Sequence, residues 1–361
     1  MELKIKTETL QNMVSKSIQC VSNNKLIPIT SLMNIRISNN RLTLTTTDAT
    51  NYFYVTSDDK FDCEDVEFSI LADTFAKLIQ KTTSTDVVLS VKDNIFEVRG
   101  NGTYKIEMPL DENGQVIKFP NKLPDMQPPI TGEIKLTTVN SILNYNKSSL
   151  AISMEVPALT NYYCGDKVVT SDSTKVCSYD IKVFGDRKLL ITPKFMELMG
   201  VMSEETINFY ISDDDELLCW DKSESIYAPL TEGIEGFPID ALMGLIDSEF
   251  KSNCKMSRIT VSEVLDRLSL FVSPYDEKAI VLTFTKDGLM FSSKKSSGTE
   301  LVPYISSENF TEFRCLIDID MLKSQIATQN SDNIEMYYGL PMAVKMVSNN
   351  VTQIVALMME E

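Results

Sequence analysis

Short runs of alternating apolar residues along this chain lead repeatedly into segments with apolar residues at helical spacing. The first such run, LKIK from Leu3, continues into a helical pattern that begins at about Thr7. The apolar positions of this helix are Leu10, Met13, Val14 and Ile18. The pattern ends at Asn23 and Asn24, so the spacing predicts a short strand followed directly by an amphipathic helix.

The same order of a strand, a helix and further strands recurs along the rest of the chain. The other strand-to-helix segments begin at Ile70, Ile134, Leu190, Ile259 and Leu316. Matching positions lie roughly 120 to 130 residues apart, which is about a third of the 361 residues. This periodicity predicts three copies of one unit, each made of two similar halves, with domains at residues 1–125, 126–248 and 249–361.

Turn residues between the apolar runs predict β-hairpins. The dipeptides are Asn39-Asn40, Asn101-Gly102 and Asp287-Gly288. The first separates two strand runs, Met33–Ile37 and Arg41–Thr45. These signals place hairpins in the first and third copies of the unit.

A longer strand motif appears twice. The stretch Leu159–Tyr179 turns at a Thr-Ser-Asp corner, Thr170 to Asp172, and the earlier run Ile35–Tyr54 has a Thr-Thr-Asp corner at Thr46 to Asp48. Because an Asp at such a corner favours a turn, we expect the same hairpin in both places. The recurrence supports the internal repeat.

Two segments are predicted to link the three domains. Phe119–Gly132 carries four prolines, at positions 120, 124, 128 and 129, and cannot be a helix interior or a central strand. The second linker is placed between Asp247 and Ser257, where the apolar periodicity fades.

Composition narrows the function classes. The chain has 34 Lys and Arg against 51 Asp and Glu, a net charge of −17, which disfavours non-specific nucleic-acid binding. No apolar run approaches the ~20 residues of a membrane span, so a cytoplasmic protein without membrane contact is expected. The seven cysteines form no CxxC pair, which indicates reduced thiols and neither a disulfide framework nor a zinc site.

Catalysis is the weaker class of hypothesis. The chain has no histidine, which excludes Ser-His-Asp, Cys-His and two-His metal arrangements, and it has no phosphate-binding GxxxxGK[ST] stretch. The acidic run Asp213 to Glu216 is a candidate for divalent-cation binding in a carboxylate-dependent hydrolase. A solvated hairpin tip is the favoured interpretation of this run.

Three stretches together resemble the bacterial DNA polymerase III β sliding clamp, of which this chain would be a divergent member. They are NYYCGDKVVTSDSTKVCSYDI from Asn161, IPIT from Ile27 followed by LTLTTTDA, and FPIDALMGLI from Phe237.

This resemblance implies an α+β fold of three clamp domains, each with two helices packed on antiparallel sheets. It further implies a head-to-tail dimer that closes into a ring around duplex DNA and tethers a polymerase. The protein would be a non-enzymatic processivity factor without cofactor or metal. Its partners would be DNA, a DNA polymerase, a clamp loader and other proteins carrying a short clamp-binding motif.

The resemblance also implies site residues. A pocket for partner peptides would contain Cys164, Ser171, Ser173, Thr174, Val176, Pro238, Met243, Val344, Val355 and Leu357. DNA contacts would come from Lys25, Lys77, Lys81, Lys147, Tyr162, Tyr163 and Arg267, with Lys16 as a further candidate. The dimer interface would join Tyr104 and Ile106 to Phe271 and Val272 of the other copy. An ordinary core or solvated role remains an alternative for each of these residues.

Two departures from the family pattern affect the pocket. Ser173, Thr174 and Lys175 stand where Gly-His-Arg is common, and the chain ends Leu-Met-Met-Glu-Glu in place of Met-Pro-Met-Arg. An altered, more basic partner motif is therefore expected. A clamp-like scaffold that does not load on DNA remains an alternative, and the sequence leaves open the ring size, the polymerase and the chromosomal, phage or plasmid origin.

Overall fold

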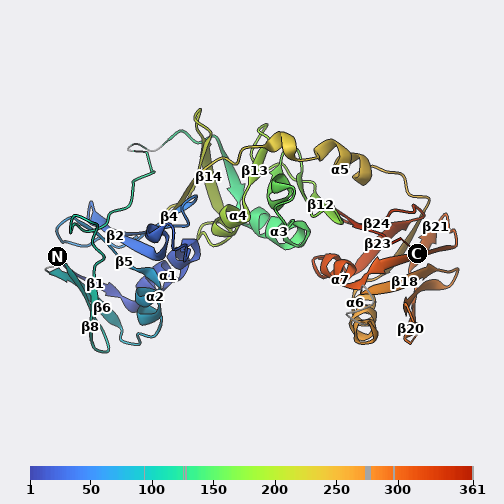
Figure 1. Ribbon diagram of the computed structural model, residues 1–361, viewed down its shortest axis with the longest axis horizontal. Helices are drawn as coiled ribbons and strands as arrows, with labels where there is room; N and C mark the ends of the chain where they lie inside the picture. The colour runs from blue at the N-terminus through green and yellow to red at the C-terminus, as the bar shows by residue number, and fades with distance from the viewer. Residues whose placement is uncertain (93, 125, 127, 273–277, 296, 360–361) are drawn as a thin grey trace. The chain divides into compact units, whose positions relative to one another are not determined.

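The computed structural model describes all residues except 93, 125, 127, 273–277, 296 and 360–361 (Figure 1). The described residues form an α+β fold of antiparallel sheets. They group into two compact units, Met1–Val139 with Lys194–Leu230, and Asn140–Pro193 with Thr231–Glu361. No helix in the described part of the chain is long and apolar enough to cross a membrane.

A module of one strand, one helix and three further strands repeats six times, as the sequence predicts. The first two modules are β1 (Glu2–Lys6), α1 (Thr7–Ser17), β2 (Leu32–Ser38), β3 (Arg41–Thr47) and β4 (Tyr52–Thr56), then β5 (Val66–Leu71), α2 (Ala72–Gln80), β6 (Asp86–Lys92), β7 (Ile95–Arg99) and β8 (Thr103–Glu107). The next two are β9 (Gly132–Lys135), α3 (Leu136–Asn146), β10 (Tyr162–Cys164), β11 (Val168–Ser171) and β12 (Lys175–Tyr179), then β13 (Leu189–Ile191), α4 (Pro193–Gly200), β14 (Thr206–Ile211), β15 (Glu216–Trp220) and β16 (Glu224–Pro229).

The fifth and sixth modules complete the chain. They are β17 (Ser252–Ser257), α6 (Arg258–Leu268), β18 (Ala279–Phe284), β19 (Gly288–Ser293) and β20 (Thr299–Pro303), then β22 (Phe313–Asp318), α7 (Ile319–Ala327), β23 (Asn333–Tyr338), β24 (Ala343–Ser348) and β25 (Val351–Ala356). Helix α5 (Ile239–Ile246), strand β21 (Ser306–Glu308) and the short 3-10 helices fall outside the repeat. The three domains predicted from the sequence stay a prediction, because the described residues group into two compact units.

The first strand of each module joins the sheet of the other module in its pair. For example, β1 pairs with β6 and β5 pairs with β2. At two places, the last strands of two different modules pair with each other and so join two sheets into one. These pairs are β4 with β16 and β12 with β25. The resulting sheet orders are β1-β6-β7-β8 and β5-β2-β3-β4-β16-β15-β14-β9 in the first unit, and β13-β10-β11-β12-β25-β24-β23-β17-β21 and β20-β19-β18-β22 in the second.

Helices pack in pairs on the sheets of each unit (Figure 1). Helix α1 contacts α2, β3 and β4. In the second unit, α6 and α7 contact each other, and their apolar faces join the strands of both sheets in one core that includes Leu265, Phe284, Leu322 and Val355. Burial of these apolar faces is the main source of stability.

The repeated Thr-Asp corner has a structural reason. The hydroxyl of Thr46 donates to the carbonyl of Ser17 at 2.6 Å, and that of Thr170 donates to the carbonyl of Asn146 at 2.9 Å. Each acceptor lies at the end of a helix, α1 or α3, whose last carbonyl groups lack helical partners. The corner threonine therefore fastens a helix end to the sheet.

The corner aspartate forms the turn that follows. Its Oδ1 accepts from the backbone N–H three residues later at 2.7 Å, and a third copy of this turn occurs in the fourth module. The pairs are Asp48 with Asn51, Asp172 with Lys175, and Asp221 with Glu224. The hairpin at Asn39 and Asn40 is also confirmed, with φ of 51° and 62°.

The second linker is shorter than predicted. Residues Ser252–Ser257 form β17, which pairs with β23 and β21. Ser252, Cys254 and Met256 point into the core while Asn253 and Lys255 do not, so the polar residues that suggested a linker are the open face of a half-buried strand.

Candidate partner-binding site and free sheet edges

An apolar cluster lies where β12 pairs with β25, on the face of the nine-stranded sheet opposite α6 and α7. Val176 faces Ile354 across the two strands, and α5 packs against β25 on this face (Figure 1). Half-buried apolar side chains surround the buried members and remain accessible to a ligand: Ile234, Ile239, Leu242, Met243 and Leu245. We call this the β12–β25 cluster.

Phe237 anchors the segment that leads into α5. Its ring stacks on Tyr163 of β10, with centroids 5.0 Å apart and an interplanar angle of 25°. Both rings are buried. Pro238 follows at the N-cap of α5, where a proline does not cost a helical hydrogen bond. The Phe-Pro pair therefore fixes where α5 begins on the sheet.

Lys345 holds the other end of α5. Its Nζ donates to the carbonyl groups of Ile246 and Ser248, each at 3.1 Å, and lies 4.8 Å from the centre of the Phe250 ring. Desolvation by burial lowers the pKa of Lys345 from its ordinary value. A cation at the C-terminus of a helix is favoured by the helix dipole. Helix α5 is thus pinned at both ends, which leaves its Met243 side facing the cluster.

The turn from Asp172 to Lys175 forms a polar rim beside the cluster. The Asp172 carboxylate accepts from the backbone N–H and the hydroxyl of Thr174, at 2.9 and 2.7 Å. Lys175 Nζ lies 3.2 Å from Asp172 and donates to the Ser148 carbonyl at 2.6 Å. The Thr174 carbonyl accepts from Ala356 N–H at 2.8 Å, which ties the rim to β25. The lysine charge at the rim is therefore already engaged.

The structure brings together only part of the predicted peptide site. Val176 and Met243 belong to the β12–β25 cluster, and Pro238, Ser173 and Thr174 lie at its edge. Val344 and Val355 instead belong to the core beneath α6 and α7, and Leu357 packs against that core. Ser171 and Cys164 are fully buried, and burial raises the pKa of the Cys164 thiol far above its usual range.

Several members of the cluster were missed by the sequence reasoning. They are Tyr163, Val169, Phe237, Ala343 and Ile354. Ile354 and Ala343 are the immediate neighbours of Val355 and Val344, so the cluster and the predicted residues differ by one position in each strand. Since strand side chains alternate, a one-residue difference exchanges the two faces of the sheet. The strand alternation alone does not tell which face carries the helices.

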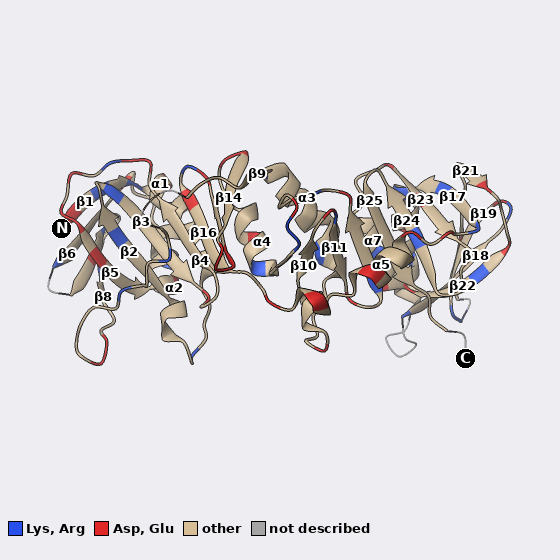
Figure 2. Cartoon of the chain, turned by 90° about the horizontal axis from the view of Figure 1, so that it is seen from above, with Lys and Arg blue, Asp and Glu red and all other residues tan. Residues whose placement is uncertain are grey.

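Of the predicted DNA-contacting cations, Lys16, Lys77 and Arg267 form ion pairs with acidic side chains. Lys77 binds Asp73 at 2.6 Å, and Arg267 binds Glu300 through two hydrogen bonds of 2.9 and 2.7 Å. Lys16 is mostly buried and binds Glu224, so it is not available to a phosphate. Lys25, Lys81 and Lys147 are exposed. Acidic and basic residues are interspersed along the chain (Figure 2).

The predicted DNA-contacting tyrosines are both buried. Tyr162 is 0% exposed and Tyr163 is 5% exposed, with its ring face against Phe237. Neither ring presents a face to an unpaired base in this conformation, so the structure gives no support to stacking on DNA. Tyr163 serves instead as the floor under the start of α5.

Among the outer strands of the sheets that the described residues form, two are the last strands of their modules. β8 is the outer strand of β1-β6-β7-β8, and β20 is the outer strand of β20-β19-β18-β22. On β8, Tyr104 is 44% exposed while Ile106 is buried. Beside β20, Phe271 is 54% exposed, and Val272 is partly buried against the core. Unpaired strand edges with exposed apolar side chains are typical of sites where another chain binds.

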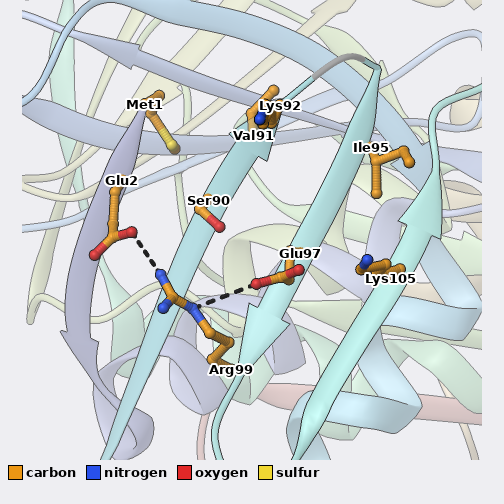
Figure 3. A pocket seen from close by; sticks show the side chains of 9 residues that line it. All are labelled: Met1, Glu2, Ser90, Val91, Lys92, Ile95, Glu97, Arg99 and Lys105. Atoms are coloured by element: carbon orange, nitrogen blue, oxygen red, sulfur yellow. Dashed lines mark hydrogen bonds and ion pairs between the residues drawn. The ribbon is translucent and has the colours of Figure 1, made fainter.

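The sheet that ends in β8 has a charged face. A groove of about 540 Å³ lies across β1, β6, β7 and β8 (Figure 3). The Arg99 guanidinium donates to Glu2 at 2.5 Å and lies 3.4 Å from Glu97, with Lys92 and Lys105 on the same face. These polar walls contrast with the apolar β12–β25 cluster.

The acidic run considered for metal binding forms a hairpin tip. Asp213, Asp214 and Asp215 lie exposed between β14 and β15, and Glu216 accepts a hydrogen bond from the Tyr227 hydroxyl. Within the residues that the structure describes, no three acidic or cysteine side chains form a group suited to a metal ion.

Comparison with known proteins gives a consistent result. Residues 1–115 match the family model "DNA polymerase III beta subunit, N-terminal domain". No curated protein matches the sequence. The fold is similar over 100% of both chains to the DNA polymerase sliding clamp of Bacillus subtilis, with a TM-score of 0.86 at 15% identity. It is equally similar over full length to the β subunits of Thermotoga maritima (0.85, 15%) and Borrelia burgdorferi (0.85, 17%). The chain therefore has the β sliding-clamp fold from end to end.

Proposed function

We propose that this chain is a DNA sliding clamp, a non-catalytic cytoplasmic processivity factor whose copies close into a ring around duplex DNA. The observation that carries the proposal is the pairing of last strands across modules. Modules one and four join through β4 and β16, and modules three and six join through β12 and β25. Modules two and five keep unpaired last strands, β8 and β20.

The internal repeat implies how two copies would close. If β8 of one copy pairs with β20 of the next as β4 pairs with β16, two four-stranded sheets become one eight-stranded sheet. Such a head-to-tail contact closes a ring when it is used twice, and it pairs the free edges of β8 and β20. Tyr104 and Ile106 would then meet Phe271 and Val272 of the other copy.

The charge pattern fits a ring that encloses DNA and attracts it weakly. A net charge of −17 and ion-paired cations such as Lys77 and Arg267 limit the number of phosphates that the chain can neutralise. We assign phosphate contacts to the solvent-exposed side chains of Lys25, Lys81 and Lys147. Few phosphate contacts keep a clamp mobile along the duplex.

Retention on DNA is the direct test of this proposal. The chain, loaded with its clamp loader on nicked circular duplex, is expected to co-elute with the circle and to leave when the circle is cut once. A protein that stays after linearisation binds DNA by attraction, and one that never stays on the circle is a clamp-like scaffold. Either result contradicts the proposal.

The β12–β25 cluster is the proposed site for partner peptides. It offers an apolar surface with a polar rim, as ligand pockets do, and Met243 gives it an adaptable wall. Because Lys175 is paired with Asp172, the rim has no spare cation for an acidic peptide. We therefore expect a basic-flanked clamp motif to bind more tightly than an acidic-flanked one at moderate salt.

Met243→Glu is expected to weaken the binding of a clamp-motif peptide at least about 10-fold, since a charge in an apolar contact costs more than ~1.4 kcal/mol. Fluorescence anisotropy of a labelled peptide measures the effect. The matched control is Ile259→Glu, an exposed apolar residue on α6. Unchanged affinity in Met243→Glu would place the peptide elsewhere.

A further inference from the structure

The two sheet junctions within the chain are equivalent positions of the internal repeat. The β4–β16 junction lies in the first unit and the β12–β25 junction in the second. Asp48 and Asp172 fix the correspondence, because each forms the same turn just before the junction strand. Counted from these turns, Tyr52 corresponds to Val176, and their cross-strand partners are Tyr227 and Ile354.

The lining of the two junctions differs. The residue three positions before the turn aspartate is Thr45 at the first junction and Val169 at the second. The residue that pairs with it on the neighbouring strand is Asn34 at the first junction and Tyr163 at the second. The apolar surface of the β12–β25 cluster is thus replaced at the β4–β16 junction by amide, hydroxyl and phenol groups. An aromatic cluster forms there from Tyr52, Tyr54, Leu218, Trp220 and Tyr227.

Each junction is also crossed by a segment that begins with Phe-Pro. At the second junction, Phe237 and Pro238 lead into α5, and the cluster beside them stays half open. At the first junction, Phe119 and Pro120 begin an extended segment with no helix. We call residues Phe119–Leu123 the strap.

The strap is seated on the aromatic cluster. Leu123 packs against the cluster, and Lys122 N–H donates to the Tyr54 hydroxyl at 3.1 Å. The Lys122 ammonium lies 5.7 Å from the centre of the Tyr227 ring, within cation–π range. Phe119 is buried. The segment therefore uses an aliphatic anchor, a backbone hydrogen bond and a charge contact, which are the contacts of a bound peptide.

A residual cavity marks the edge of this site. Its volume is about 210 Å³, and its walls combine the strap with strands β2 to β5. Asn34 and Thr45 are buried side chains that line it, and Arg36 is exposed at its mouth. The strap thus leaves part of the junction surface open beside it.

We propose that the strap is an intramolecular ligand of the β4–β16 junction. It occupies the position that is left open for a partner peptide at the equivalent β12–β25 junction. The inference rests on the proposed function for the second junction. A tethered segment has an effective concentration in the millimolar range, so it excludes weakly binding external peptides. Each chain therefore binds one partner peptide, although its repeat provides two equivalent junctions.

Trp220 provides the measurement, since it is the only tryptophan in the chain and is 7% exposed within the aromatic cluster against which Leu123 packs. Leu123→Ser is expected to red-shift its emission and to increase its quenching by acrylamide. The control Met126→Ser changes an 82% exposed residue of the same linker and is expected to leave both signals unchanged. An unchanged Trp220 signal in Leu123→Ser overturns the proposal.

A second measurement tests whether the strap sequence binds to the junction as a separate peptide. In a variant with residues 119–123 replaced by glycine and serine, a synthetic peptide of residues 117–125 is expected to bind once per chain and restore the wild-type Trp220 emission. If that variant does not fold, Leu123→Ala receives the same peptide. Failure of the peptide to bind overturns the proposal, as does a wild-type chain that binds two clamp-motif peptides. The Trp220 signal needs neither DNA nor partner, so it is independent of the retention test.

Discussion

Phe271→Asp is expected to convert a two-copy ring into single chains. The Phe271 ring is 54% exposed and lies close to Gly298, one residue before β20, so it would be covered when β20 pairs with another copy. Placing a carboxylate there costs roughly 3 kcal/mol per contact, which corresponds to about a 100-fold weaker association. A closed dimer contains the contact twice, so the effect is felt at both junctions.

Light scattering coupled to size exclusion measures this change. Wild type is expected at twice the chain mass and Phe271→Asp at the chain mass. The control Ile152→Asp places the same charge on a residue of the same unit that is 98% exposed and away from β20, and it is expected to remain dimeric. A dimeric Phe271→Asp variant, or a monomeric wild type, contradicts ring closure through β8 and β20.

Lys16→Met is expected to destabilise the protein by roughly 3 to 5 kcal/mol at pH 7, because it leaves a buried carboxylate without its cation. Lys16 Nζ lies 2.8 Å from Glu224 Oε1, and the two side chains are 15% and 3% exposed. Glu224 also accepts from Ser203 N–H at 3.0 Å. The pair joins α1 to β16 and so reinforces the β4–β16 junction.

The loss in Lys16→Met is expected to shrink as the pH falls. Burial raises the pKa of Glu224 above its ordinary value, and Lys16 opposes that rise. Without Lys16 the folded-state pKa of Glu224 moves further up, so the folded variant binds a proton that the unfolded chain binds only at lower pH. Stability is then gained as the pH falls through the raised pKa, and the difference from wild type narrows toward the ordinary carboxyl range.

Urea unfolding of wild type and variant between pH 7 and pH 4.5 measures this difference. Asp221, beside Glu224, has a lowered pKa; burial raises it, but hydrogen bonds from the N–H groups of Glu224 and Ser223 outweigh burial. Its own contribution is lost as the pH falls in both proteins. Lys16→Met/Glu224→Gln is expected to recover most of the loss. Lys77→Met, which breaks an exposed pair, is the control, with an expected effect under about 1 kcal/mol. A pH-independent loss would contradict this account.

Local signals in the sequence predicted the elements well. The Asn39-Asn40 hairpin, the Thr-Asp corners and the strand-to-helix starts other than the one at Ile259 follow from short-range chemistry, and the structure confirms them. Ile259 lies inside α6, and the strand that leads into this helix is β17. Prolines marked the first linker, but polar residues misled the interpretation of Ser252–Ser257, where they form the open face of β17.

Side-chain roles were harder to predict because they depend on contacts distant in sequence. Lys16 has the pattern of a solvated helix residue, yet its partner Glu224 lies 208 residues away. Val344 and Val355 were placed in the peptide site, but the helices cover that face of their strands. The strap has the composition of a plain linker, and only the packing of Leu123 on the aromatic cluster and the hydrogen bond to Tyr54 distinguish it.

The sequence by itself therefore determined the six-fold repeat, the α+β class and the turns, since each depends on residues close along the chain. The tertiary structure decided which strands join across repeats, which face of β24 and β25 is open, and which charges are buried in pairs. The physical reason is that strand periodicity defines two faces without saying which one a distant helix covers. Burial of Glu224, the half-open β12–β25 cluster and the seated strap all follow from that long-range choice.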